Sequence, residues 1–209
     1  MGPRRWSGFY FITDSALTTL GVRADVEAAL AGGTALVQYR EKGRAYDERL
    51  AEARDLLRVC RSAGVPFIIN DEIALARDSG ADGIHLGQGD APPEDARAAL
   101  GSEAIVGVSV GSPEEACEAE RAGADYVAAS PVFSTTTKLD AGPRVGIEGL
   151  RAIRAATGLP VAAIGGLTRE RIPDVVAAGA DLVCAISASL SNGDVAANVR
   201  ALRETMAPR

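Results

Sequence analysis

Short runs of apolar residues recur along the whole chain, separated by longer stretches in which polar residues are frequent. Within each run the apolar positions are consecutive, as expected for parallel strands that are covered on both faces. We therefore predict eight β-strands, at Phe9–Ile12, Ala35–Tyr39, Pro66–Ile69, Gly83–Leu86, Ile105–Val108, Tyr126–Ala129, Val161–Ile164 and Leu182–Ile186.

The stretches between these runs have the spacing of amphipathic helices. After the second predicted strand, apolar residues recur at helical intervals, at Leu50, Ala53, Leu57 and Cys60. Ser112-Pro113-Glu114-Glu115 has the order of a helix start, with a capping side chain, a proline and then acidic residues. The tripeptide Gly-Ala-Asp occurs three times between a helical stretch and a strand, where glycine suits the left-handed residue that ends a helix.

Eight alternating strand and helix units predict an α/β fold, a single (β/α)₈ TIM barrel over residues 1–209. A doubly wound open sheet is the alternative. That fold more often has a glycine-rich loop after its first strand, and Ile12-Thr13-Asp14-Ser15 contains no glycine.

The composition narrows the classes of function. Apolar residues make up 47% and charged residues 24% of the chain, which is typical of a globular protein. A net charge of −6 argues against binding nucleic acid or an anionic membrane surface. The three cysteines, Cys60, Cys117 and Cys184, lack metal-ligand spacing, so we interpret them as reduced thiols of a cytoplasmic protein without a catalytic role. The partners expected are small molecules, and a homodimer is compatible with these features.

Rare residue types gather at one place in the predicted barrel. The chain has twenty Arg but only two Lys, two Gln and one His. Both lysines and both glutamines lie at or just after the ends of predicted strands, where barrels of this kind carry their chemistry. They are Lys42, Lys138, Gln38 and Gln88. The single histidine, His85, lies inside a predicted strand, and we interpret it as a packed or hydrogen-bonded barrel residue.

Two carboxylates follow adjacent predicted strands. Asp71 comes after the third strand and Asp90 after the fourth, so the two side chains can converge on one cation. Oxygen ligands without His or Cys suit Mg²⁺, which shares phosphate oxygens with a substrate. The alternative is that each aspartate caps the helix that follows it.

Cations and glycines at the same end of the barrel suit phosphate groups. Arg40, Lys42 and Lys138 could bind a polyanion such as diphosphate, or alternatively pair with Glu41 or Asp140. Gly165-Gly166 follows the seventh strand, where backbone N–H groups of such barrels often hold a phosphate monoester. A side chain at Gly166 would be expected to intrude on that phosphate.

These segments resemble the thiamine-phosphate synthase (thiamine-phosphate pyrophosphorylase) family over nearly the whole chain. The matching motifs, in order, are Tyr10-Phe11-Ile12-Thr13-Asp14, Val37-Gln38-Tyr39-Arg40-Glu41-Lys42, Ile69-Asn70-Asp71, Gly80-Ala81-Asp82-Gly83-Ile84-His85-Leu86-Gly87-Gln88-Gly89-Asp90, Gly107-Val108-Ser109, Pro131-Val132-Phe133-Ser134-Thr135-Thr136-Thr137-Lys138, Ala163-Ile164-Gly165-Gly166 and Ala185-Ile186-Ser187-Ala188.

The resemblance implies a Mg²⁺-assisted, dissociative substitution that joins hydroxymethylpyrimidine diphosphate to a thiazole phosphate and releases diphosphate. It implies that Arg40, Lys42 and Lys138 are catalytic and that Asp71 and Asp90 bind Mg²⁺. The residues implied for the pyrimidine diphosphate are Gln38, Tyr39, Arg40, Glu41, Lys42, Asn70, Ser109 and Lys138. Those implied for the thiazole phosphate, or its carboxylate form, are Thr135, Thr136, Thr137, Gly166, Ile186 and Ser187.

Two alternatives belong to other classes of activity. One is a thiazole tautomerase of the same superfamily, but that branch tends to lose the Thr-rich Lys motif and the Gln-x-Asp motif, and this chain has both. The other is a non-catalytic sensor of a phosphate ligand, which would not need the carboxylate pair. Release of diphosphate from the two substrates distinguishes all three.

Overall fold

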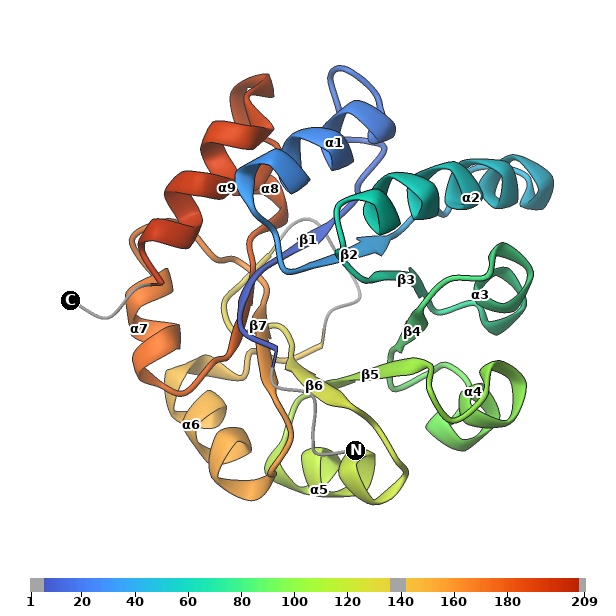
Figure 1. The fold of residues 1–209 in the computed structure, drawn as a ribbon. Coiled ribbons are helices and arrows are strands. Elements are labelled where there is room, and N and C mark those ends of the chain that lie inside the picture. The colour runs from blue at the N-terminus through green and yellow to red at the C-terminus, as the bar shows by residue number, and fades with distance from the viewer. Residues whose placement is uncertain (1–5, 136–141, 207–209) are drawn as a thin grey trace.

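Eight parallel strands form a closed barrel in the computed structural model, which describes residues 6–135 and 142–206 (Figure 1). Each strand pairs with the next in sequence, and the eighth pairs with the first. The predicted (β/α)₈ fold is therefore confirmed. The strands are β1 (Gly8–Ile12), β2 (Leu36–Tyr39), β3 (Phe67–Asn70), β4 (Gly83–Leu86), β5 (Ile105–Val110), β6 (Tyr126–Ala129), β7 (Val161–Ile164) and β8 (Leu182–Cys184).

A ring of helices surrounds the strands (Figure 1). It consists of α1 (Val22–Gly32), α2 (Tyr46–Ser62), α3 (Ile73–Ser79), α4 (Pro93–Leu100), α5 (Pro113–Arg121), α6 (Gly146–Ala156), α7 (Ile172–Ala177) and α9 (Val195–Glu204), with the short α8 (Ile186–Ser189) and a 3₁₀ turn (Ser191–Gly193) before α9. The predicted capping by Ser112 is confirmed, since its side chain accepts from the Glu115 N–H at 3.2 Å.

The last strand is shorter than predicted. The sequence predicts a strand at Leu182–Ile186, but β8 ends at Cys184 and Ile186 begins α8. Cys184 pairs with Ile164, which is the last residue of β7. Beyond Cys184 the chain has no neighbouring β7 backbone to pair with, and it turns into a helix instead.

Side chains alternate between two apolar layers along each strand, because successive residues of a strand point to opposite faces. In β1, Phe9 and Phe11 pack between the barrel and the helices, whereas Tyr10 and Ile12 point into the barrel. In β2, Tyr39 belongs to the outer layer and Leu36 to the inner one. Residues that could reach a ligand inside the barrel mouth are therefore every second residue of each strand.

The three Gly-Ala-Asp tripeptides form a repeated clamp at the N-terminal ends of the strands. The glycines have positive φ angles, as predicted for helix ends. Each aspartate accepts a backbone N–H from the first or second residue of the preceding strand: Asp82 that of Phe67, Asp125 that of Val106 and Asp181 that of Val161, at 2.8–2.9 Å. An arginine of the helix that comes before the clamped strand pairs with the same carboxylate: Arg61 of α2, Arg97 of α4 or Arg154 of α6.

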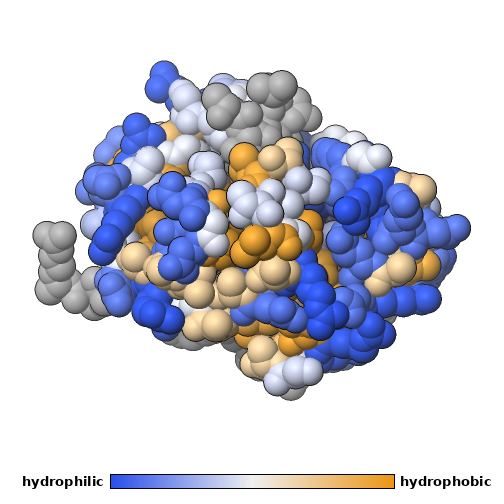
Figure 2. Space-filling model, turned by 90° about the horizontal axis from the view of Figure 1, so that it is seen from above, coloured by the Kyte–Doolittle hydropathy of each residue, from blue (hydrophilic) through white to orange (hydrophobic). Residues whose placement is uncertain are grey.

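Hydrophilic and hydrophobic residues are unevenly distributed over the face seen in Figure 2. In Figure 2 hydrophilic residues dominate the side on which α2 lies in Figure 1, and hydrophobic residues gather towards the middle of the view. Over the described part of the chain, every helix is too short or too polar to span a membrane.

Candidate functional site

A cavity opens where the strands end and the βα loops begin, and it contains about 770 Å³ of space, part of it open to solvent. Ten of the residues that the sequence proposes for the site line it: Gln38, Arg40, Lys42, Asn70, Asp71, Ser109, Thr135, Gly166, Ile186 and Ser187.

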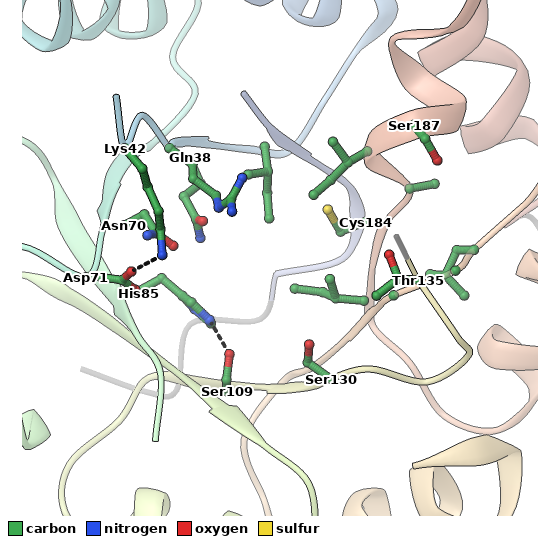
Figure 3. Close-up of a pocket in the computed structure, with 18 residues that line it drawn as sticks. Gln38, Lys42, Asn70, Asp71, His85, Ser109, Ser130, Thr135, Cys184 and Ser187 are labelled. Atoms are coloured by element: carbon green, nitrogen blue, oxygen red, sulfur yellow. Dashed lines mark hydrogen bonds and ion pairs between the residues drawn. The ribbon is translucent and has the colours of Figure 1, made fainter. Parts of the chain in front are cut away.

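The lining divides into two sides (Figure 3). Gln38, Lys42, Asn70 and Asp71 lie on one side, on β2, β3 and the loops that follow. Thr135 and Ser187 lie on the opposite side. The groups implied by the resemblance for the pyrimidine diphosphate and for the thiazole phosphate are thus on facing walls, with open space between them.

The carboxylates of Asp71 and Asp90 converge. Burial raises the pKa of Asp71 above its ordinary value, and the adjacent Asp90 carboxylate raises it further, with partial compensation by Lys42. The Lys42 ammonium lies 3.6 Å from Asp71. Two like charges held together in this way would gain from a cation between them. Within the described ranges no group of three or more His, Cys, Asp or Glu side chains is arranged to hold a metal ion, so a metal here would need further oxygens from water or substrate.

Neither aspartate caps a helix, so the alternative reading of this pair is wrong. The residue at the N-terminal cap of α3 is Glu72 and that of α4 is Pro92, and neither helix has a side-chain cap. Asp90 instead accepts the Gly87 N–H at 2.7 Å. Asp71 has a φ of 63°, a left-handed conformation that costs a non-glycine residue energy. Its N–H is bonded to the His85 carbonyl at 2.8 Å, which holds this conformation.

Arg40 is held from two directions by the segment after β1. Its guanidinium lies 3.3 Å from the Asp14 carboxylate, which is 7% exposed. Its backbone N–H donates to the Thr13 hydroxyl at 2.9 Å. Arg40 and Lys42 therefore pair with Asp14 and Asp71 rather than with Glu41. Both cations still line the cavity, where an anionic ligand can reach them.

The expectation that a side chain at Gly166 would intrude on a bound phosphate stays a prediction. Among the described residues, a Cβ there would overlap the Ser134 carbonyl and approach Phe133. At Gly165, a Cβ would approach Pro131. The glycines are needed because this loop packs closely on the segment after β6, with Val132 and Phe133 donating to Ile164 and Gly165 at 2.8 and 3.0 Å.

Some proposed residues lie elsewhere. The Tyr39 side chain is buried in the outer layer and donates to Glu52 of α2 at 2.7 Å. The Glu41 carboxylate accepts from the Gly43 N–H within its own loop. The structure therefore brings neither side chain to the cavity. Thr136, Thr137 and Lys138 lie outside the described residues.

His85 is hydrogen-bonded inside the barrel, as predicted, and it also lines the cavity. Sequence reasoning missed several other lining residues, among them Ile12, Ser130, Ile164 and Cys184. The alternation along the strands could have identified Ile12 and Cys184, which point into the barrel. Burial raises the pKa of the Cys184 thiol, so its position in the wall does not make it a nucleophile.

Comparisons with known proteins agree with one another. A family model described as thiamine monophosphate synthase matches residues 9–189. The thiamine-phosphate synthase of Methanoregula boonei is 47% identical over 198 residues, which cover 93% of this chain and 91% of the relative. That of Chloroflexus aurantiacus is 44% identical over 195 residues, covering 93% and 90%. The solved structure of thiamine phosphate pyrophosphorylase from Pyrococcus furiosus superposes with a TM-score of 0.86 at 35% identity, covering 95% of both chains.

Proposed function

The chain belongs to the thiamine monophosphate synthase family, and from this premise we propose that it is a transferase that makes thiamine phosphate. It would join 4-amino-2-methyl-5-hydroxymethylpyrimidine diphosphate to 4-methyl-5-(2-phosphoethyl)thiazole, or to the carboxylate form of that thiazole, and release diphosphate. The observation that carries the proposal is the divided cavity, which has Arg40, Lys42 and Asp71 on one wall and a loop with glycines on the other; Asp90 lies beside Asp71 but does not itself line the cavity.

The reaction needs no general base. The thiazole nitrogen forms a bond to the methylene carbon of the pyrimidine while the bond from that carbon to the diphosphate oxygen breaks. The aminopyrimidine ring can carry the positive charge that develops. Catalysis then depends on binding the leaving diphosphate and aligning the acceptor.

The residues of this chain suit these two tasks. Arg40 and Lys42 would bind the diphosphate, and the Asp14 contact would keep the Arg40 guanidinium in place. Gln38, Asn70 and Ser109 would hold the pyrimidine on the same wall. Gly166, Ile186 and Ser187, with Thr135, would hold the thiazole phosphate on the other wall. Lys138 and the neighbouring Thr136 and Thr137 stay sequence-based assignments.

Asp71 and Asp90 fit a Mg²⁺ ion, because their oxygens converge and their mutual repulsion would be relieved by a cation. When bound, Mg²⁺ would neutralise charge on the leaving diphosphate. The Lys42 ammonium, which also lies beside Asp71, would add positive charge at the same place.

The test is a coupled assay for diphosphate release from the two substrates. We expect release only when both substrates and Mg²⁺ are present, and loss of release in excess EDTA. Full activity in EDTA with metal-free substrates would refute the Mg²⁺ assignment. Isomerisation of a thiazole carboxylate phosphate without diphosphate release would favour the tautomerase, and binding without turnover would favour the sensor.

We also propose a reducing, cytoplasmic location and a homodimer. The location is supported by the unpaired state of Cys60, Cys117 and Cys184. The homodimer would cover Leu17 and Leu20, large hydrophobic side chains of the loop after β1 that are 38% and 73% exposed. Light scattering of the wild type and of a Leu17→Ser, Leu20→Ser variant tests the assembly.

A further inference from the structure

A continuous line of hydrogen bonds crosses the barrel interior and joins two residues of the cavity wall. Gln38 donates from its amide nitrogen to the Tyr10 hydroxyl. The Tyr10 and Tyr126 hydroxyls are 2.9 Å apart. Tyr126 in turn contacts His85 Nδ1 at 2.8 Å. His85 Nε2 contacts the Ser109 hydroxyl at 2.9 Å, a contact that Figure 3 shows. The mechanism above uses the two ends of this line but not the three residues between them.

The barrel is shaped to hold this line. Gln38, Tyr10 and Tyr126 are at most 1% exposed and His85 is 5% exposed. Gly107 of β5 is paired with His85 on one side and with Tyr126 on the other. A Cβ at Gly107 would overlap the Tyr126 phenol, so a glycine is required for that phenol to cross β5 and reach His85.

The direction of the bonds follows from the donor at one end. The Gln38 NH₂ group can only donate, so the Tyr10 oxygen accepts and the Tyr10 hydrogen is left for Tyr126. Tyr126 then accepts from Tyr10 and donates its own hydrogen to His85 Nδ1. A histidine that accepts at Nδ1 and is neutral carries its hydrogen on Nε2, so it donates to Ser109.

The tyrosines can keep these roles at neutral pH. Burial raises the pKa of both Tyr10 and Tyr126, so each retains its hydroxyl hydrogen. Ser109 accepts one bond from His85, and the hydrogen of its own hydroxyl is then available on the cavity side, where Ser109 lines the wall. The Gln88 amide, which donates to the Ser109 carbonyl at 2.6 Å, fixes the backbone of the same residue.

We propose that Tyr10, Tyr126 and His85 are positioning residues, whose one-way hydrogen-bond chain holds His85 in its neutral Nε2–H tautomer and so presents the Ser109 hydroxyl to the substrate as a donor. The inference rests on the proposed function, because the group that would receive this donor is an acceptor atom of the pyrimidine diphosphate. The reverse chain, which starts from the Gln38 carbonyl, would make Ser109 donate to His85 and leave it only an acceptor towards the cavity.

The tautomer can be observed directly, since His85 is the only histidine of the chain. Long-range ¹H–¹⁵N spectra of the ¹⁵N-labelled wild type, without substrate, should show one imidazole with a protonated Nε2 and a bare Nδ1 at neutral pH. A protonated Nδ1, or an imidazolium, would overturn the proposal. This experiment does not depend on turnover, so it remains decisive even if the protein releases no diphosphate.

A substitution at Gln38, the far end of the hydrogen-bond chain, tests whether all of its bonds run in one direction. At pH 8 the carboxylate of a Gln38→Glu variant, in a cavity that also holds Arg40 and Lys42, can only accept. Tyr10 would then donate to it, and every following bond would reverse. The expected result is a switch of His85 to the Nδ1–H tautomer, three hydrogen bonds away from the substitution. An unchanged tautomer would show that the group at position 38 does not set the donor and acceptor roles along the hydrogen-bond chain.

Steady-state kinetics test whether the hydrogen-bond chain contributes to kcat/KM. Tyr126→Phe should lower kcat/KM for the pyrimidine diphosphate roughly tenfold, the value of about one neutral hydrogen bond. In a Ser109→Ala background the same substitution should have no further effect, because Tyr126 acts through Ser109. Tyr46→Phe is the matched control, since the Tyr46 hydroxyl donates to Asp78 outside the barrel. Equal losses from Tyr126→Phe in both backgrounds would reduce Tyr126 to a packing role.

Discussion

Asp71 and Asp90 connect the stability of this protein to its proposed metal. The folded-state pKa of Asp71 is raised by burial and by Asp90, so its ionised form is less favourable in the folded chain than in the unfolded chain. Stability associated with protonated Asp71 is therefore present at low pH and is lost as the pH rises through this folded-state pKa. The metal-free protein therefore carries an unfavourable interaction between the two carboxylates, which Lys42 offsets only in part.

We accordingly expect Asp90→Asn to stabilise the metal-free protein at pH 7 and to abolish Mg²⁺-dependent turnover. The asparagine oxygen can still accept the Gly87 N–H, so the loop geometry is kept. Thermal unfolding with and without Mg²⁺ measures the first effect and diphosphate release the second, with an expected loss of roughly 10²-fold or more. A metal-free variant that melts below the wild type at pH 7 would contradict the repulsion argument.

Two signals in the sequence indicated side chains that line the cavity. Gln38 and Lys42 belong to rare residue types, and Asp71 follows a clear strand end. The Tyr39 side chain does not line the cavity, because Gln38 points inward and its neighbour in the strand must point outward. The Tyr10–Tyr126–His85 contacts could not be predicted, since they depend on β1, β4 and β6 meeting across the barrel interior.

The loop after β7 packs closely on the loop after β6 at the mouth of the barrel, and Gly166 lies against Phe133 and Ser134 there. Gly166→Ala should displace the Phe133–Ser134 backbone and with it Thr135, so we expect KM for the thiazole phosphate to rise about tenfold or more, with a smaller change for the pyrimidine diphosphate. Gly80→Ala is the matched control, because Gly80 has a similar φ, 72° against 62°, but open space around a Cβ. Equal kinetic effects of the two substitutions would attribute the loss to backbone strain alone.

Strand starts are secured at the opposite end of the barrel by the Gly-Ala-Asp clamps. Asp181→Ala leaves the buried Val161 N–H without its side-chain acceptor and Arg154 without its carboxylate, so we expect a loss of about 1–3 kcal/mol in the free energy of unfolding. The control is Asp55→Ala, which removes ion pairs on the surface of α2 and should cost less than about 1 kcal/mol. Urea denaturation of both variants gives the comparison, and a smaller loss for Asp181→Ala than for Asp55→Ala would refute a structural role for the clamp.

The order of the elements was predictable for a physical reason. Parallel strands covered on both faces give continuous apolar runs, and β4, β6 and β7 have the bounds that the sequence predicts. The end of β8 was not predictable in this way, because Ile186 favours a strand by its own propensity while the end of β7 at Ile164 leaves it no partner. Tertiary context decided that boundary.

The clamps that stabilise the strands and the cavity of the proposed site lie at opposite ends of the barrel. The clamps bind the N-terminal ends of the strands, and the cavity opens at their C-terminal ends. Ligand binding at one end and a clamp substitution at the other share no residue, so their effects on the free energy of unfolding should add.

We therefore expect Mg²⁺ with inorganic diphosphate to stabilise the wild type and the Asp181→Ala variant by the same increment. For a ligand that binds only the folded state, that increment is about 2.7 kcal/mol when its concentration is 100 times its Kd. Calorimetric titration of both proteins should give equal Kd values, and urea denaturation with and without the ligands should give equal increments. The closed ring of strands explains why a local clamp should shift the whole unfolding equilibrium: each strand pairs with both neighbours, so opening one end removes partners from the next. A weaker Kd or a smaller increment in Asp181→Ala would mean that the clamp shapes the cavity as well, and the division between the two ends would then be incorrect.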